Sequence, residues 1–198
     1  MVIDAGAGTV SALGADGATL QPAVLADDPR VVGSSANLSS SNVPTMDRMS
    51  ATSSLNLTSG SAYAVRTVVR KTGMYSRIRF CTASTAPVGI TDLRAAVFST
   101  TSYTAISQTL NIAALATAGN TIIEAALATP IGLTLGSQVM LGLGFVGTTL
   151  QVRGAALSSA LAGLDPVLAK TGSLLLGGEL TTVGGSATGN IVWMELLP

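Results

Sequence analysis

From about Met46 to its end, this chain of 198 residues is a succession of short runs in which apolar and polar side chains alternate. In the run from 76 to 82, Ile78 and Phe80 lie on one face of an extended strand, and Arg77 and Arg79 lie on the other. Turn residues separate such runs at intervals of roughly 8–12 residues, and no long helical pattern comes between them. This organisation predicts an all-β fold, a β-sandwich or jelly roll.

We expect strands at residues 63–69, 76–82, 93–99, 103–107, 109–115, 121–127, 131–135, 138–146, 149–155, 173–176, 180–183 and 190–197. A helical turn is expected at residues 157–164, before Pro166. Gly142 and Gly144 interrupt the run at 138–146. They indicate either a bulge or bend in that strand, or the close approach of a backbone from another subunit.

The chain contains no histidine and a single cysteine, Cys81. Catalysis near neutral pH usually relies on histidine, paired carboxylates or an activated thiol. A Ser-His-Asp triad is therefore excluded. Glu124, Glu179 and Glu195 are scattered in the sequence, and nothing in it aligns them as a glycosidase pair. One cysteine makes neither a zinc site nor an intrachain disulfide. We expect no enzymatic activity, no cofactor and no metal.

Residues 1–45 differ from the rest of the chain, because glycine, proline and a serine-rich tract at 33–42 interrupt the apolar pattern. A short helix is compatible only with residues 21–28. We interpret residues 1–45 as an extended N-terminal arm and linker that lies against another molecule, and residues 46–198 as the β-sandwich domain. The expected contact residues of the arm are Val2, Ile3, Val10, Leu13, Leu20, Val24, Leu25, Asp27 and Asp28.

Charge is scarce and unevenly placed. Only 10% of the residues are charged and the net charge is zero. Residues 1–45 carry four aspartates and one arginine, a net charge of −3, whereas residues 46–94 carry seven cations and two aspartates, a net charge of +5. The basic cluster of the second segment comprises Arg66, Arg70, Lys71, Arg77 and Arg79.

This basic cluster has three possible uses: nucleic-acid binding, a solvated sheet face, or a salt-bridge site between subunits. The zero net charge and the few aromatic residues nearby argue against nucleic acid, which we do not expect as a partner. The four arginines Arg66, Arg70, Arg77 and Arg79 are therefore candidate assembly contacts, available to the acidic arm of a neighbouring copy.

The low charge also predicts self-association. About 25% of residues are charged in a typical soluble domain. A free monomer with only 10% charged residues would be prone to associate with other molecules. We expect a homo-oligomer. The mean hydropathy is +0.55, but polar residues interrupt the uncharged stretches 95–123 and 125–152, so no membrane insertion is expected. The acidic start of the chain is unlike a signal peptide, which favours synthesis in a cytoplasm.

Residues 20–32, with the sequence LQPAVLADDPRVV, resemble segments near the starts of minor tail and fibre proteins of tailed bacteriophages that infect actinobacteria. The composition, rich in Ala, Gly and Thr and with little lysine, is similar too. The strand-rich remainder resembles the small jelly-roll or sandwich domains on such virions. The resemblance implies a trimeric structural protein on the virion exterior, made in the host bacterial cytoplasm and anchored by its arm to other capsid or tail proteins. It implies no catalytic residues.

These observations favour a capsid decoration protein or a short tail-fibre component. The alternative is a carbohydrate-binding module that recognises a host-surface glycan, and a third hypothesis is a hydrolase without histidine. An exposed row of aromatic side chains would favour the carbohydrate-binding module. An arm that lies on another subunit would favour the structural role.

Overall fold

The computed structural model describes residues 2–4, 9–13, 20–23, 41–158, 167–173 and 179–198. The chain divides into two compact units, Met1–Ser40 and Ser41–Pro198. Every strand pair among the described residues is antiparallel. The prediction of an all-β fold is confirmed.

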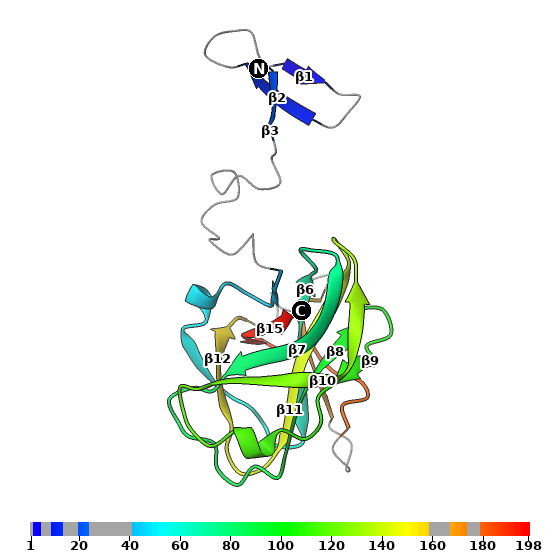
Figure 1. Cartoon of the computed structure of the whole chain (residues 1–198). Helices are drawn as coiled ribbons and strands as arrows, with labels where there is room; N and C mark the ends of the chain where they lie inside the picture. Colours follow the sequence, from blue (N-terminus) through cyan, green and yellow to red (C-terminus); the bar gives the residue numbers. More distant parts are fainter. Residues whose placement is uncertain (1, 5–8, 14–19, 24–40, 159–166, 174–178) are drawn as a thin grey trace. The chain divides into compact units, whose positions relative to one another are not determined.

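The described part of the first unit is a three-stranded sheet (Figure 1). Its strands, in the order β1-β2-β3, are Val2–Asp4, Thr9–Leu13 and Leu20–Ala23. Residues 21–23, where a helix was considered, are therefore strand, and residues 24–28 lie outside the described residues. The role of this unit as an arm stays a prediction.

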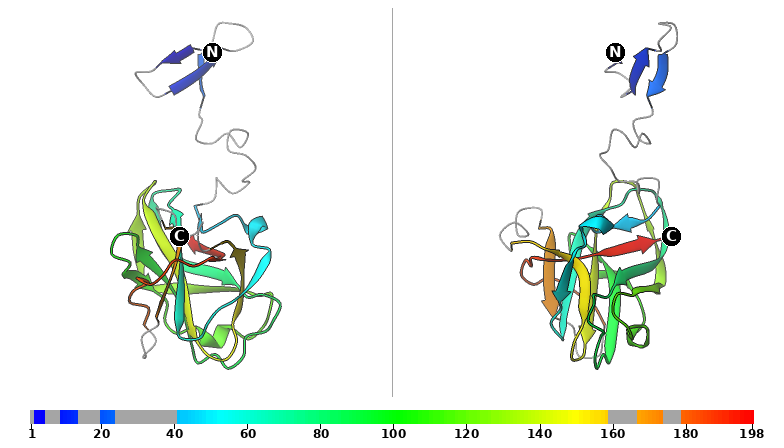
Figure 2. Two further views of the ribbon diagram at one scale, coloured as in Figure 1. Left: turned by 180° about the vertical axis from the view of Figure 1, so that it is seen from behind. Right: turned by 90° about the vertical axis from the view of Figure 1, so that its left-hand side faces the viewer.

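The second unit is a sandwich of two main sheets around one core (Figures 1 and 2). The five-stranded sheet has the order β13-β6-β11-β8-β9, with bounds Ala169–Ser173, Ser61–Val68, Gln138–Val146, Asp92–Ser99 and Ala105–Gln108. The four-stranded sheet has the order β10-β7-β15-β4, with bounds Ile122–Leu133, Gly73–Cys81, Met194–Leu197 and Val43–Pro44. Alternate residues of both sheets fill the core, among them Val65 and Leu141 of the first and Ile78 and Phe80 of the second. The alternation that predicts the strands therefore also builds the core.

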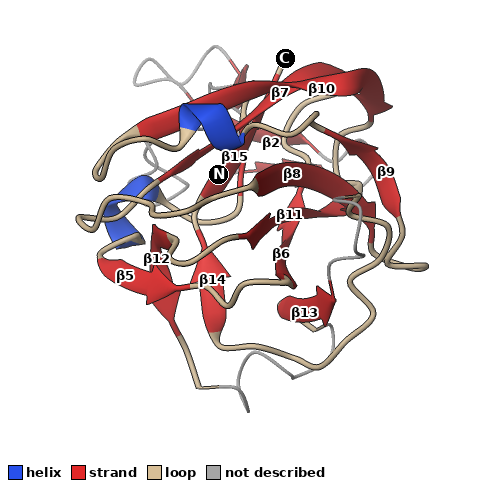
Figure 3. Ribbon diagram, turned by 90° about the horizontal axis from the view of Figure 1, so that it is seen from below, coloured by secondary structure: helices blue, strands red, loops and turns tan. Residues whose placement is uncertain are grey.

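A third, smaller sheet lies at one end of the sandwich (Figure 3). Its strands, in the order β14-β12-β5, are Asn190–Val192, Gln151–Ala156 and Ser53–Asn56. The end of the chain changes sheets at Trp193, because β14 pairs with β12 whereas β15 pairs with β7. Thr45 stabilises this corner. Its hydroxyl accepts a hydrogen bond from Met194 N at 2.9 Å and donates one to the Val192 carbonyl at 2.8 Å.

The sandwich domain begins earlier than the boundary expected between residues 45 and 46. Strand β4 pairs with β15, and Val43 is fully buried in the core. Thr67 of β6 donates a hydrogen bond from its hydroxyl to the Pro44 carbonyl at 2.6 Å. The boundary between the two units lies between Ser40 and Ser41 because residues 43–45 contribute to both core and sheet.

Gly142 belongs to a regular strand, so the expectation of a bulge there is wrong. Strand β11 pairs with β6 and β8 without a shift in register through this position. The outer face of the five-stranded sheet carries its own small core, in which Phe98 and Met140 pack with Leu180. A Cβ at position 142 would lie 2.5 Å from Cε2 of Phe98. The glycine is therefore required by an aromatic ring of its own chain.

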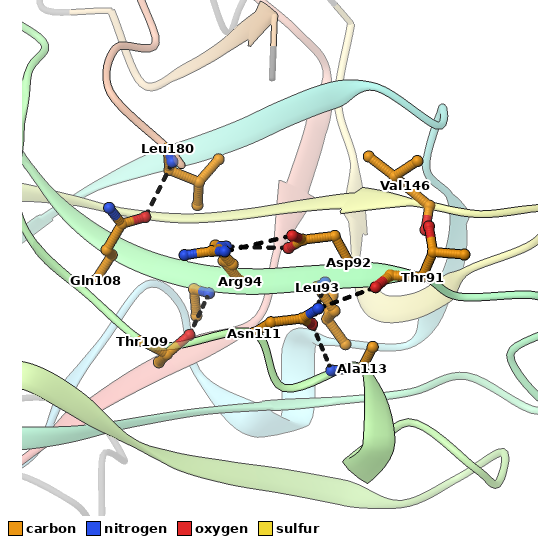
Figure 4. Close-up of polar contacts among 11 residues, drawn as sticks. Thr91, Asp92, Leu93, Arg94, Gln108, Thr109, Asn111, Ala113, Val146 and Leu180 are labelled. Atoms are coloured by element: carbon orange, nitrogen blue, oxygen red, sulfur yellow. Dashed lines mark hydrogen bonds and ion pairs between the residues drawn. The ribbon is translucent and has the colours of Figure 1, made fainter. Parts of the chain in front are cut away.

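Residues 109–115 do not form the expected strand. Beside β8, the Thr109 hydroxyl accepts a hydrogen bond from the strand backbone at 3.2 Å, and Asn111 Oδ1 accepts one from Leu93 N at 3.1 Å (Figure 4). Asn111 Oδ1 also accepts from the first residue of a 3-10 helix, η2 (Ala113–Leu115). Two N–H groups of β8 thus bond to side chains where a regular ladder would use backbone carbonyls.

The two strands expected at 121–127 and 131–135 form one strand, β10, whose pairing with β7 shifts between Ala126 and Ile131. The intervening residues reach the other main sheet, where Leu127 bridges to Thr109 and Ser107 Oγ donates to the Thr129 carbonyl at 2.6 Å. The two main sheets are therefore joined along this side.

The remaining differences are small. The strand expected at 180–183 is reduced to a single bridge, Thr104 to Thr182. Strands β4 and β5 were not expected, and only Ser173 of β13 lies in an expected strand. A second 3-10 helix, η1 (Arg48–Ser50), was not expected either. Residues 159–164 of the expected helical turn and residues 174–176 of an expected strand lie outside the described residues.

Candidate functional site

The structure divides the predicted basic cluster between two sheets. Arg77 and Arg79 lie on β7, on the face opposite the buried Ile78 and Phe80. Arg66 lies on β6 of the other main sheet, where Nε donates to the Val167 carbonyl at 2.9 Å. The arginines therefore do not form one continuous basic surface.

Arg70 and Lys71 follow β6, and both side chains are exposed. The contact role of Arg66, Arg70, Arg77 and Arg79 stays a prediction.

Arg79 instead stands between two glutamates that the sequence leaves scattered. In the register of the four-stranded sheet, Glu124 of β10 and Glu195 of β15 are both directly opposite Arg79 of β7. Arg79 Nε donates to Glu195 Oε2 at 2.6 Å, a second guanidinium nitrogen also contacts that oxygen, and Nη1 lies 3.9 Å from Glu124 Oε2. Arg77 Nη1 binds Glu124 Oε1 at 2.7 Å. The register thus brings Glu124 and Glu195 to the same arginine, which their separation in the sequence does not indicate.

This arrangement is a structural ion-pair ladder. Glu195 is only 4% exposed, and the contacts of its Oε2 are with guanidinium groups. The arginine occupies the space between the carboxylates, which is where a glycosidase would hold the scissile bond. The ladder therefore stabilises the four-stranded sheet. A signal for it exists in the sequence, because a lone glutamate within the apolar run of residues 191–197 requires a cationic partner.

The ion-pair ladder is connected through Arg48 to the corner at Trp193, where the chain changes sheets. Arg48 Nη2 lies 3.5 Å from Glu195 Oε2, and the Arg48 guanidinium lies over the Trp193 ring, 5.5 Å from its centroid. Asp47 positions Arg48 by capping η1, because its Oδ1 accepts a hydrogen bond from Met49 N at 2.8 Å. Arg48 remains 54% exposed in its side chain, so it covers the ring without being enclosed.

A pocket of about 160 Å³ opens beside this corner, and we call it the Trp193 pocket. It is lined by Arg48, Ala51, Cys81, Ile122, Arg153 and Trp193. These residues come from η1 and the segment after it, from the paired positions Cys81 and Ile122 of β7 and β10, and from β12. The pocket therefore lies where the four-stranded sheet and the small sheet separate from each other.

Arg153 lines this pocket, and its side-chain partners among the described residues are neutral. Its Nη2 donates to Asn120 Oδ1 at 2.7 Å, and its Nη1 lies 3.5 Å from Ser54 Oγ. Asn120 has a φ of +52°, a left-handed conformation that asparagine tolerates better than most residues. Within the described part of the chain, Arg153 forms no ion pair with a carboxylate.

The Trp193 side chain is buried and its indole N–H is unsatisfied. The residue is 2% exposed, and Nε1 has no hydrogen-bond partner among the described residues. Its backbone N–H donates to the Arg153 carbonyl at 2.9 Å, which fixes the residue beside β12. A buried donor without an acceptor costs about 1–3 kcal/mol.

Cys81 contributes a neutral wall to the pocket. Burial raises the pKa of its thiol, and the nearby Arg153 guanidinium opposes that rise. The thiol donates to the Thr82 carbonyl at 3.3 Å. The thiolate that a nucleophilic role requires is therefore disfavoured at neutral pH.

The aromatic side chains do not form an exposed row. Tyr63, Tyr75 and Trp193 are buried, as are the three phenylalanines. Tyr103 is covered by the Lys170 ammonium, 3.8 Å from the ring centroid. All seven aromatic residues of the sequence lie in the described part, so the criterion set for a sugar-stacking platform is not met.

The arm residues can be placed only in part. Val2, Ile3, Val10, Leu13 and Leu20 lie in β1–β3, where Ile3 pairs with Val10 and Leu13 with Leu20. Residues 24, 25, 27 and 28, which complete the expected contact set, lie outside the described residues. The anchoring role of all nine stays a prediction.

Two further surveys of the described residues found no candidate. No group of three His, Cys, Asp or Glu side chains gathers there as a metal site would require, and no helix there is long and apolar enough to cross a membrane. A larger hollow, of about 560 Å³, is lined by described serine, threonine and glycine residues, which offer no charge or ring to fix a ligand.

No protein-family model matches the chain, and no curated protein matches it.

Proposed function

We propose that this chain is a non-enzymatic structural protein on the exterior of a bacteriophage virion, either a capsid decoration protein or a short tail-fibre component. The N-terminal unit anchors it and the sandwich domain projects outward. The proposal is supported by the sequence similarity of residues 20–32 and by the sandwich-like fold of residues 41–198.

Self-association is supported by the large aliphatic side chains that are exposed within the two uncharged stretches. Leu110 is 73% exposed and Leu135 is 67% exposed, and no charged residue occurs in residues 95–123 or 125–152. Apolar surface of this kind is usually covered by a partner. Most arginines of the domain are meanwhile engaged by their own chain, as Arg77 and Arg79 are. A homotrimer is the state we propose.

The first experiment measures the native mass of the full chain at micromolar concentration. A trimer is the expected result, and a stable monomer contradicts self-association. Antibody labelling of intact particles then tests the location. Label on the capsid or tail exterior supports the proposal, and purified particles that lack the protein refute it.

Two truncations test the anchor. Removing residues 1–40 leaves β4 intact, so we expect a folded domain that no longer joins the particle. Removing residues 1–44 also deletes Val43 from the core, so we expect it to lower stability in addition. Normal occupancy of the particle by the shorter truncation would show that residues 1–40 are not an anchor. Thermal unfolding measured by circular dichroism separates the two effects.

A further inference from the structure

We propose that the Trp193 pocket binds a small carboxylate-bearing ligand of about the size of one sugar residue. This inference does not depend on the virion role. It rests on three properties of the pocket that occur together: an uncompensated cation, an unsatisfied buried donor and an apolar wall.

The cation is Arg153. Its two contacts are with the neutral side chains of Asn120 and Ser54, so its positive charge is not cancelled by a described carboxylate. Arg48 adds a second guanidinium to the lining, and its contact with Glu195 is long, at 3.5 Å. Two guanidinium groups at one small pocket favour an anion, and their planar forks match the geometry of a carboxylate.

The donor is the Trp193 indole. Its N–H is buried and has no acceptor among the described residues. The side chain that covers the ring is Arg48, which is half exposed and held by a stacking contact and one long ion pair. A ligand oxygen that reaches this N–H would provide the missing acceptor, while Arg48 keeps its charge at the pocket.

The apolar wall decides between classes of anion. Ala51, the Ile122 side chain, the neutral Cys81 thiol and the indole ring itself offer contacts to carbon atoms. Inorganic phosphate has no carbon skeleton to place against them. A carboxylate on a sugar ring or a short acyl chain satisfies both the cations and the wall. The volume of about 160 Å³ admits one such group.

The test uses the full chain and the fluorescence of its only tryptophan, which is Trp193 itself. The protein is titrated at fixed ionic strength with sodium glucuronate, with glucose as the neutral counterpart, and with inorganic phosphate. We expect a saturable change with glucuronate and an affinity for phosphate and glucose at least about tenfold weaker. No saturable response to glucuronate overturns the proposal. Equal binding of phosphate overturns the choice of a carboxylate, and equal binding of glucose overturns the role of the cations.

A second readout is independent of fluorescence. Cys81 is the only thiol and it lines the pocket, so bound glucuronate should slow its alkylation by iodoacetamide in proportion to occupancy. Glucose at the same concentration should leave the rate unchanged. Unchanged alkylation at a glucuronate concentration that saturates the fluorescence signal would place the ligand elsewhere.

Three variants locate the site. Arg153→Gln should weaken glucuronate binding about tenfold or more, because it removes a charged donor. The matched control is Arg94→Gln, because Arg94 is paired with Asp92 on β8 and does not line the pocket. If Arg153→Gln fails to fold, substitutions of Ile122 test the site instead. Ile122 lines the pocket and is 51% exposed, so a charged side chain can be placed there. Ile122→Glu should weaken glucuronate binding and Ile122→Lys should preserve it. Equal affinities in these two variants would refute the proposal.

Discussion

Removing the buried carboxylate of the ion-pair ladder should destabilise the sandwich domain far more than removing its exposed counterpart. Glu195 and Glu124 are both cross-strand partners of Arg79, but their side chains are 5% and 35% exposed. Breaking a buried ion pair from one side costs about 3–5 kcal/mol, because the remaining charge stays desolvated. Arg79 is 21% exposed and keeps Glu124 at 3.9 Å, so we expect the lower end, about 3 kcal/mol, for Glu195→Ala.

The matched variant Glu124→Ala should cost less than about 1 kcal/mol, since its ion pairs are partly solvated. Urea unfolding, followed by far-UV circular dichroism, measures both values. The melting temperature of Glu195→Ala should fall by roughly 6–12 °C on the scale of a domain of this size. Replacing both Arg79 and Glu195 by methionine should recover most of the loss, because the pair is then removed together. Equal destabilisation by the two glutamate variants would refute the assignment of Glu195 as the buried member.

Two other predictions concern the core and the pH dependence of stability. Gly142→Ala should lower the free energy of unfolding by about 1–3 kcal/mol, because its Cβ would lie 2.5 Å from the buried Phe98 ring. The control is Gly73→Ala, whose Cβ would meet nothing within 4 Å, and it should leave the free energy of unfolding nearly unchanged in the same urea assay. Burial raises the pKa of Tyr75 above its ordinary value of 10.0, so its contribution to stability is complete below about pH 10 and is lost as the pH rises through the folded-state pKa. The fall in unfolding free energy between pH 8 and pH 11 should therefore be smaller in Tyr75→Phe, and an unchanged fall would exclude Tyr75 as its source.

The strands of the domain could be predicted because their alternation reflects burial directly. In β7, Ile78 and Phe80 are buried and Arg77 is exposed, as the period of two requires. The pattern fails where side chains replace backbone partners. Residues 109–115 have a strand-like composition, but the hydrogen bonds of Thr109 and Asn111 to β8 end the ladder there. Local composition does not contain that information.

The Trp193 pocket could not be predicted because its parts meet only through long-range register. Arg48, Cys81, Arg153 and Trp193 lie in four separate segments of the sequence. Trp193 lies within the last strand expected from the sequence, residues 190–197, and is 2% exposed. Nothing in the sequence indicates that the strand changes sheets at this residue, and that change is what brings Arg153 beside it.

The change of sheets at Trp193 also explains why polar chemistry gathers at this end of a domain with so little charge. A strand that leaves one sheet for another cannot keep a continuous ladder, so its backbone groups need other partners. Trp193 N–H still donates to the Arg153 carbonyl of β12, and the Thr45 hydroxyl supplies the new partner for Met194 N–H. The segments that carry these partners also carry Arg48 and Arg153, the two arginines that line the Trp193 pocket. The proposed site for an anionic ligand therefore lies where the sandwich places its last strand.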